Sequence, residues 1–188
     1  MLQDADGFYI ANRFSRNCLM NRLFDPSEGI GLTLLRQPLG ASDFARRHYT
    51  YDDPPDGLPD PNLDHFSIDH DRAEIIPLLQ QALGIQPRLR LMATPWSAPA
   101  WMKTSDSLIG GSLRSEFAGV YATYLARAVE AYAAEGLTID FLTVQNEPHH
   151  EPSDYPGMRM EAADQAVFIR DHLGPTFEAH GLTTRLLA

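Results

Sequence analysis

Hydrophobic residues recur along the chain with two alternating patterns, one typical of helices and one typical of buried strands. Apolar positions spaced three and four residues apart predict helices over 10–23, 71–83, 116–135 and 162–180. Short apolar runs predict strands over 31–36, 88–94, 139–144 and 184–187. Helix and strand therefore alternate along the whole chain, which favours parallel strands joined by helical crossovers.

Several positions are expected to shape or interrupt these elements. Proline lacks a backbone N–H and restricts the residue before it, so Pro38 and Pro95 are expected to stop the first two strands, and Pro77 to limit or kink the second helix. The pair Gly174-Pro175 is expected to break the last helix. The apolar stripe predicted for the first helix consists of Ile10, Phe14, Cys18, Leu19 and Leu23.

Unusual polar and aromatic residues gather just after the predicted strands, over 37–44, 95–104 and 145–156. In a (β/α)8 barrel these segments are the loops at the carboxyl ends of the strands, where active sites lie, although an open parallel sheet also binds ligands there. The long stretch 40–69 has no periodic pattern, and such loops are usually functional. A whole barrel has eight strands and at least about 200 residues. Because four strands are predicted, we expect an α/β fold that is part of a TIM barrel.

Composition and charge exclude several classes of protein. Hydrophobic residues make up 44% of the 188 residues, which suits a chain with a packed core. The formal net charge of -10 provides no basic surface for nucleic acid or for anionic membranes. The single cysteine excludes an internal disulfide and a cysteine-based zinc site. The acidic N-terminus does not look like a signal peptide, no apolar run is long enough for a membrane span, and the compartment stays open.

The segment 143–148, Thr-Val-Gln-Asn-Glu-Pro, contains the strongest candidate for chemistry. A carboxylate at the mouth of a parallel sheet can act as a general acid toward a leaving oxygen, which suits Glu147. Asn146 offers an amide donor and an acceptor for a sugar hydroxyl. The structural alternative is a carboxylate that caps backbone groups or forms a salt bridge.

Two further segments contain candidate residues for sugar binding. Trp96 and Trp101 lie in a short proline-rich loop over 93–104, where indoles could stack on the apolar faces of a sugar, or could simply pack in the core. Arg36 at a strand end would pair with a carboxylate, whereas Asp43 could bind a sugar hydroxyl instead. The run His149–Glu151 lacks the spacing of a metal site, and no phosphate-binding glycine motif occurs.

Taken together these segments resemble glycoside hydrolase family 30, and most of all its glucosylceramidase (acid β-glucosidase) branch. The resemblance covers nearly the whole chain, and the tryptophan-rich loop followed by Asn-Glu-Pro is its most specific part. The stretch Tyr-Thr-Tyr-Asp-Asp over 49–53 favours this branch over the xylanase branch. The matching segments are 35–38, 42–44, 49–53, 62–67, 95–104 and 145–148.

The resemblance implies a retaining hydrolase of β-glucosides or glucosylceramide-like substrates, with no metal or organic cofactor. Glu147 would be the general acid/base, and Asn146 would hold the 2-hydroxyl of the sugar. The residues implied to contact or support the glucosyl unit are Asp43, Trp96, Arg36 and Tyr155. Members of the family are often secreted or lysosomal, so the resemblance leaves the localisation open.

One departure from the family matters for activity. Retaining glycosidases use two carboxyl groups about 5–5.5 Å apart, and the family's nucleophile is a Glu on the seventh barrel strand. If the first strand here is the family's second, residues 1–188 form one partial barrel domain without the first strand, the last three strands, the β-sandwich and the nucleophile. The chain is then either the acid/base half of a β-glucosidase, active only with the missing half of the barrel, or an inert fragment with at most weak sugar binding.

Overall fold

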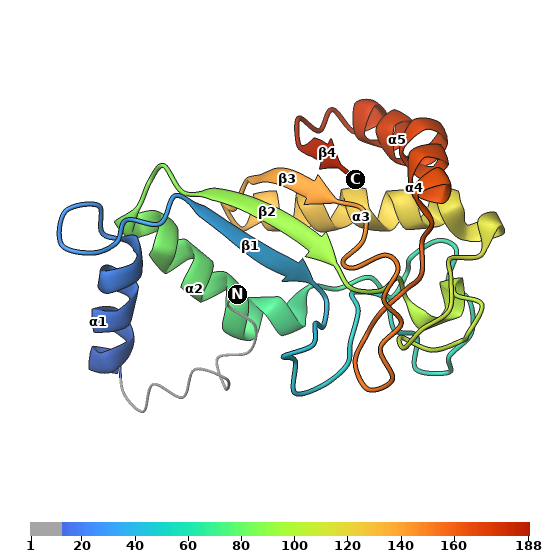
Figure 1. Ribbon diagram of the computed structural model, residues 1–188, viewed down its shortest axis with the longest axis horizontal. Coiled ribbons are helices and arrows are strands. Elements are labelled where there is room, and N and C mark those ends of the chain that lie inside the picture. Colours follow the sequence, from blue (N-terminus) through green and yellow to red (C-terminus); the bar gives the residue numbers. More distant parts are fainter. Residues whose placement is uncertain (1–12) are drawn as a thin grey trace.

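The computed structural model describes residues 13–188, in which a parallel sheet is packed against helices (Figure 1). The strands are β1 (Leu34–Leu39), β2 (Arg90–Pro95), β3 (Ile139–Thr143) and β4 (Arg185–Leu187). The α-helices are α1 (Arg13–Phe24), α2 (Asp69–Ile85), α3 (Ala118–Ala134), α4 (Ala162–Phe168) and α5 (Gly174–Ala179). Short 3-10 turns η1 (Ala100–Met102) and η2 (Ser115–Phe117) and a π-helical turn η3 (Ile169–Leu173) complete the list.

The strands are arranged in the sheet in the order in which they occur along the chain. The order is β1-β2-β3-β4, and all three pairs are parallel. An open doubly wound sheet reverses its strand order at a switch point, whereas a barrel keeps it. The predicted alternation of helix and strand is therefore confirmed, and this order is that of a segment of an α/β barrel.

The two faces of the sheet differ in what covers them. Leu35, Leu91 and Leu142 are buried and belong to the hydrophobic core, to which α2 and α3 contribute from behind the sheet (Figure 1). Arg36 and Met92, which are partners in the ladder and point to the opposite face by strand alternation, are only partly buried. The core thus lies between sheet and helices, and the other face is available to functional side chains.

The N-terminal part of the fold departs from the prediction in two ways. The first strand runs through Pro38 instead of stopping before it, and Pro38 pairs with Thr94 of β2. Cys18 is exposed, whereas Met20 and Phe24, one helical turn apart, are the buried residues of α1. The predicted stripe was therefore wrong at Cys18, while Ile10 and the side chain of Phe14 lie outside the described part.

The prolines of the later elements also behave differently from the prediction. Pro95 is the last residue of β2 rather than the first residue after it. Pro77 does not end α2, which continues through it for 17 residues, and the kink stays a prediction. Gly174-Pro175 does not break the last helix, because the π-helical turn η3 leads directly into α5. The Gly174 N–H donates to the Ile169 carbonyl five residues earlier, so the helix widens there and continues.

The stretch between β1 and α2 contains no helix or strand, as predicted, yet it is firmly attached to the core. The hydroxyls of Tyr49, Tyr51 and Tyr132 donate to the fully buried Asp71 carboxylate at 2.7, 2.5 and 2.5 Å. Hydrogen bonds to a buried carboxylate are among the stronger ones in proteins. This network fixes the loop against α2 and α3. No helix of the described residues combines the length and apolar character needed to cross a membrane.

Candidate active site

Three neighbouring strands bring predicted site residues to the same end of the sheet. Arg36 is in β1, Trp96 directly follows β2, and Asn146 and Glu147 follow β3. The backbone N–H of Asn146 donates to the Pro95 carbonyl at 2.9 Å, which holds the segment after β3 against the end of β2. Because the carboxyl ends of parallel strands meet at one edge, residues 110 positions apart in sequence become neighbours.

The Arg36 guanidinium lies at the centre of this cluster. It donates to Asn146 Oδ1 at 2.6 Å and to Thr94 Oγ1 at 3.1 Å, and it lies 4.9 Å from the centroid of the Trp96 ring. Partial burial lowers the pKa of Arg36, and the nearby Glu147 and Asp43 carboxylates oppose that shift. The arginine thus orients the Asn146 amide.

Glu147 lies at the open end of this arrangement. Its side chain is exposed, and its Oε2 accepts a 3.3 Å hydrogen bond from the Asn146 amide nitrogen. Its backbone has φ of +42°, a left-handed conformation that costs energy for a residue with a Cβ. Such strain is concentrated at functional positions, where the fold holds a side chain in a direction that relaxed backbone would not give.

Asp43 and Tyr155 complete the cluster from two loops. Asp43 is exposed and lies close enough to act electrostatically on both Arg36 and Tyr155. Desolvation raises the pKa of the Tyr155 phenol, and the charges of Glu147 and Asp43 raise it further. The Tyr155 hydroxyl also hydrogen-bonds His150 Nε2 at 3.0 Å. Six predicted site residues therefore meet at one place.

Trp101 does not join them. Its indole N–H donates to Asp52 Oδ2 at 2.9 Å, its ring packs edge-on against Phe117 with centroids 5.0 Å apart, and it is only 4% exposed. Among the described residues it has the surroundings of a core tryptophan, the alternative weighed from the sequence. Trp96 is also buried, but its ring lies beside the Arg36 guanidinium at the site.

Two polar residues at this edge were given no role in the sequence analysis. Thr94 accepts from Arg36 and from the Thr143 hydroxyl at 2.8 Å, so the two threonines support the arginine from the neighbouring strands. The Gln145 amide donates to the Trp96 carbonyl at 2.7 Å. A polar residue near the end of an apolar strand or just after it was the available signal.

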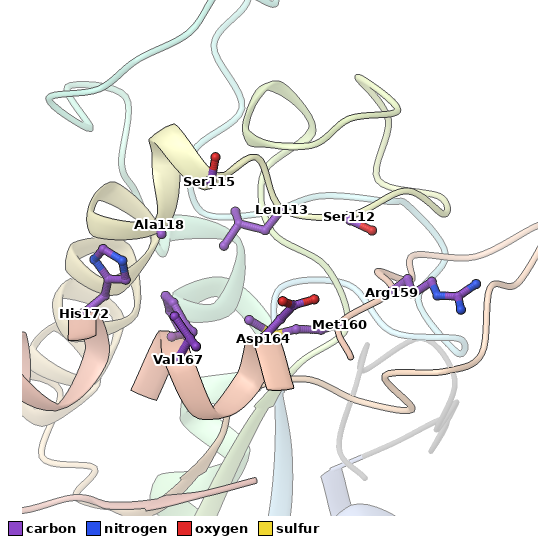
Figure 2. A pocket seen from close by; sticks show the side chains of 10 residues that line it. Ser112, Leu113, Ser115, Ala118, Arg159, Met160, Asp164, Val167 and His172 are labelled. Atoms are coloured by element: carbon purple, nitrogen blue, oxygen red, sulfur yellow. The ribbon is translucent and has the colours of Figure 1, made fainter. Parts of the chain in front are cut away.

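Other potential sites lie outside the cluster. In residues 13–188 no three His, Cys, Asp or Glu side chains are arranged to hold a metal ion. A cavity of about 180 Å³ lies between α3, α4 and the segment before η2, with Met160 and Asp164 on one side and Ala118 and His172 on the other (Figure 2). It shares no lining residue with the cluster at the strand ends.

Proteins similar to this chain in sequence are glycoside hydrolases. The chain is 32% identical over 186 residues to endo-1,6-β-D-glucanase neg1 of Aspergillus fumigatus, covering 90% of this chain and 38% of that protein. It is 36% identical over 179 residues to lysosomal acid glucosylceramidase of Mus musculus, covering 90% and 34%. The chain thus spans little more than a third of the length of these relatives.

Solved structures give the same result. An endo-β1,6-glucanase superposes with a TM-score of 0.87 at 30% identity, covering 94% of this chain and 39% of that one. The catalytic domain of a family 30 xylanase from Talaromyces cellulolyticus superposes with a TM-score of 0.75 at 29% identity, covering 94% and 41%. The family model for the glycosyl hydrolase family 30 TIM-barrel domain matches residues 2–188. The chain therefore belongs to glycosyl hydrolase family 30, and its four parallel strands are part of that family's barrel.

Proposed function

We propose that this chain provides the acid/base half of a retaining glycosidase site that acts on β-glucosidic bonds, with Glu147 as the general acid/base. The observation that carries the proposal is the 2.6 Å hydrogen bond from Arg36 to Asn146 Oδ1. It directs the other end of the amide, the nitrogen, toward Glu147. An amide donor beside an exposed carboxylate suits a sugar whose 2-hydroxyl and glycosidic oxygen lie side by side.

Each residue of the cluster then has a role consistent with its chemistry. Glu147 gives its proton to the leaving oxygen and later takes one from the attacking water. The Asn146 amide donates to the 2-hydroxyl, and the exposed Asp43 carboxylate accepts from another hydroxyl of the same ring. Arg36 keeps Asn146 in place, the Trp96 ring forms a wall beside Arg36, and Tyr155 lies near the Glu147 and Asp43 carboxylates.

The nucleophile of the proposed reaction lies outside these residues. Retaining hydrolysis needs a second carboxylate on the opposite face of the sugar, about 5–5.5 Å from the first. Two of the acidic residues that follow Glu147 are engaged elsewhere, because Glu151 and Glu161 both pair with Arg159, at 3.6 and 2.7 Å. We therefore assign the nucleophile to the part of the barrel that the longer relatives possess.

For the substrate we propose a β-linked glucosyl unit, which endo-1,6-β-glucanases and glucosylceramidases have in common. Relatives of both kinds are 30–36% identical to this chain. A xylanase-type substrate is the alternative, supported by the 29% identical family 30 xylanase. An inert chain with at most weak sugar binding is the non-enzymatic alternative.

The first experiment assays the purified chain with an aryl β-glucoside at mildly acidic pH, with Glu147→Gln as the control. We expect no turnover above this control, because an acid without a nucleophile cannot form the glycosyl-enzyme intermediate. Turnover that disappears in Glu147→Gln would show that a second carboxylate within these residues acts as nucleophile, and would contradict the assignment above.

The second experiment supplies the rest of the barrel. Residues 13–188 replace the matching segment of the Aspergillus fumigatus endo-1,6-β-glucanase, and the chimera is assayed on β-1,6-glucan, aryl β-glucosides and aryl β-xylosides. We expect Glu147→Gln to slow substrates with poor leaving groups far more than activated aryl glucosides, since only the former need the acid. Equal losses on both would argue against an acid/base role, and a preference for xylosides would favour the xylanase alternative.

A further inference from the structure

Lys103 is the only lysine in the 188-residue chain, and its side chain is completely buried. The other basic residues are arginines. A lysine is almost never fully buried unless its ammonium is paired. Here Nζ donates to Ser97 Oγ at 2.8 Å, to the Leu108 carbonyl at 2.9 Å and to the Gly157 carbonyl at 2.8 Å. The three hydrogens of the ammonium are thus matched by three acceptors.

These acceptors come from three segments that are separate in the sequence. Ser97 directly follows Trp96, and Gly157 lies two residues after Tyr155. Leu108 belongs to a segment that folds back on itself, because Thr104 N donates to the Ser112 carbonyl at 2.9 Å. The ammonium therefore joins the loop carrying Trp96, the loop carrying Tyr155 and the segment around Leu108.

We propose that Lys103 is a positioning residue of this site, whose ammonium fixes the loop carrying Tyr155 against the loop carrying Trp96. The inference rests on the proposed function, because it takes both loops to contact the sugar. Lys103 itself, with no exposed surface, touches no substrate.

The surroundings explain why this position holds a lysine rather than an apolar residue or an arginine. Burial lowers the pKa of the Lys103 ammonium to about 7, with Glu151 opposing that shift, so its charge is kept at a cost. A methionine would fill the same space but lose the hydrogen bonds to Ser97 Oγ and to the Leu108 and Gly157 carbonyls. The planar guanidinium of arginine does not match three acceptors placed around one compact ammonium.

The loop that carries Tyr155 has little freedom at this point. The Gly157 N–H donates to the Leu108 carbonyl at 3.0 Å, so Gly157 contacts the neighbouring segment through both its backbone groups. A Cβ at Gly157 would lie 2.5 Å from Cδ of Pro152, too close for any other residue without movement. The loop is therefore closely packed where Lys103 holds it, and a change at Nζ is transmitted to Tyr155.

The test compares the wild-type chain with Lys103→Met, by amide hydrogen exchange and by calorimetric binding of the gluco-configured inhibitor 1-deoxynojirimycin. We expect faster exchange in 105–111 and 150–158 with α3 unchanged, and affinity reduced about tenfold or more, since small displacements of positioning groups are costly. In a Tyr155→Phe background the same substitution should reduce affinity much less. A purely structural lysine would not give this non-additivity.

Each alternative outcome has a definite meaning. Unchanged exchange in both segments, or faster exchange with unchanged affinity, would overturn the positioning role. If Lys103→Met exchanges faster throughout the chain, including α3, the variant is globally destabilised and Ser97→Ala is measured instead. Ser97→Ala removes one acceptor of the ammonium and should speed exchange in the same two segments. Unchanged exchange in Ser97→Ala would overturn the inference. If the wild-type chain binds no inhibitor, sugar binding by this site is refuted together with the positioning role that depends on it. The exchange data then decide separately whether Lys103 holds the two loops together.

Discussion

Replacing Asp52 with asparagine should stabilise the protein at neutral pH. The Asp52 side chain has no exposed surface, and its Oδ2 accepts from the Trp101 indole at 2.9 Å. Within residues 13–188 its Oδ1 is buried without a hydrogen-bond partner. Burial raises the pKa of this carboxyl to about 6, the Trp101 hydrogen bond opposes the shift, and the nearby Asp60 carboxylate adds to it.

The size of the effect follows from the two pKa values. The folded value of about 6 lies above the ordinary value of 3.8, so the folded state binds more protons between these pH values and stability falls as pH rises through that range. At about 1.4 kcal/mol per pKa unit, the charged carboxylate costs at most about 3 kcal/mol at pH 7. Asparagine keeps the acceptor for Trp101 but buries an unpaired N–H, which costs about 1 kcal/mol. The net gain expected at pH 7 is about 2 kcal/mol.

Urea unfolding followed by tryptophan fluorescence at several values between pH 4 and pH 7 measures this difference. We expect Asp52→Asn to be more stable at pH 7 and to lose its advantage toward pH 4, where the wild-type carboxyl is protonated. Asp56→Asn, which removes an exposed carboxylate from the same loop, is the control. A difference between Asp52→Asn and wild type that does not change with pH would refute the reasoning.

Three further predictions follow from other contacts. Arg36→Lys keeps the charge but loses the planar guanidinium that donates to Asn146 and Thr94. The free energy of unfolding in urea should therefore fall by about 2 kcal/mol, and the affinity for the inhibitor should fall as well. Unchanged affinity would mean that Asn146 does not need this support. Tyr132→Phe removes a hydroxyl that donates to the buried Asp71 and should cost about 1.5–3 kcal/mol in the same assay, whereas a loss below 0.5 kcal/mol would contradict the network. Cys18 is exposed and should react with a thiol reagent in the folded protein as fast as in urea; strong protection would place it in an interface.

The alternation of helices and strands could be predicted because each element carries its own period of apolar residues. The core of α3 illustrates this, since Tyr121, Leu125 and Tyr132 follow helical spacing and all are buried. The errors arose where tertiary context overrides local preference. Pro38 lies within a strand because it pairs with Thr94 of β2, a tertiary contact that the local sequence does not reveal.

The sequence indicated which residues to consider for the site, but not the contacts that these residues make. Sequence motifs indicated Arg36 and Asn146 as candidates. Their 2.6 Å hydrogen bond, however, joins positions 110 residues apart and depends on the packing of three strands. Motif matching also grouped Trp101 with Trp96, although one packs in the core and the other lies beside Arg36. The two tryptophans are five residues apart on an irregular loop. Such a loop has no helical or strand periodicity, so the sequence does not show which way each side chain points.

The polar contacts divide the protein into a part that stabilises the fold and a part that shapes the site. Asp71 and Asp52 are buried and accept hydrogen bonds from Tyr51 and Trp101, and neither belongs to the cluster of candidate site residues. The Arg36 and Lys103 contacts instead join the ends of strands and the loops after them. Substitutions in the first group should therefore change the free energy of unfolding while leaving ligand affinity intact. Substitutions in the second group should change ligand affinity in addition to any change in stability, because they displace the loops proposed to contact the sugar.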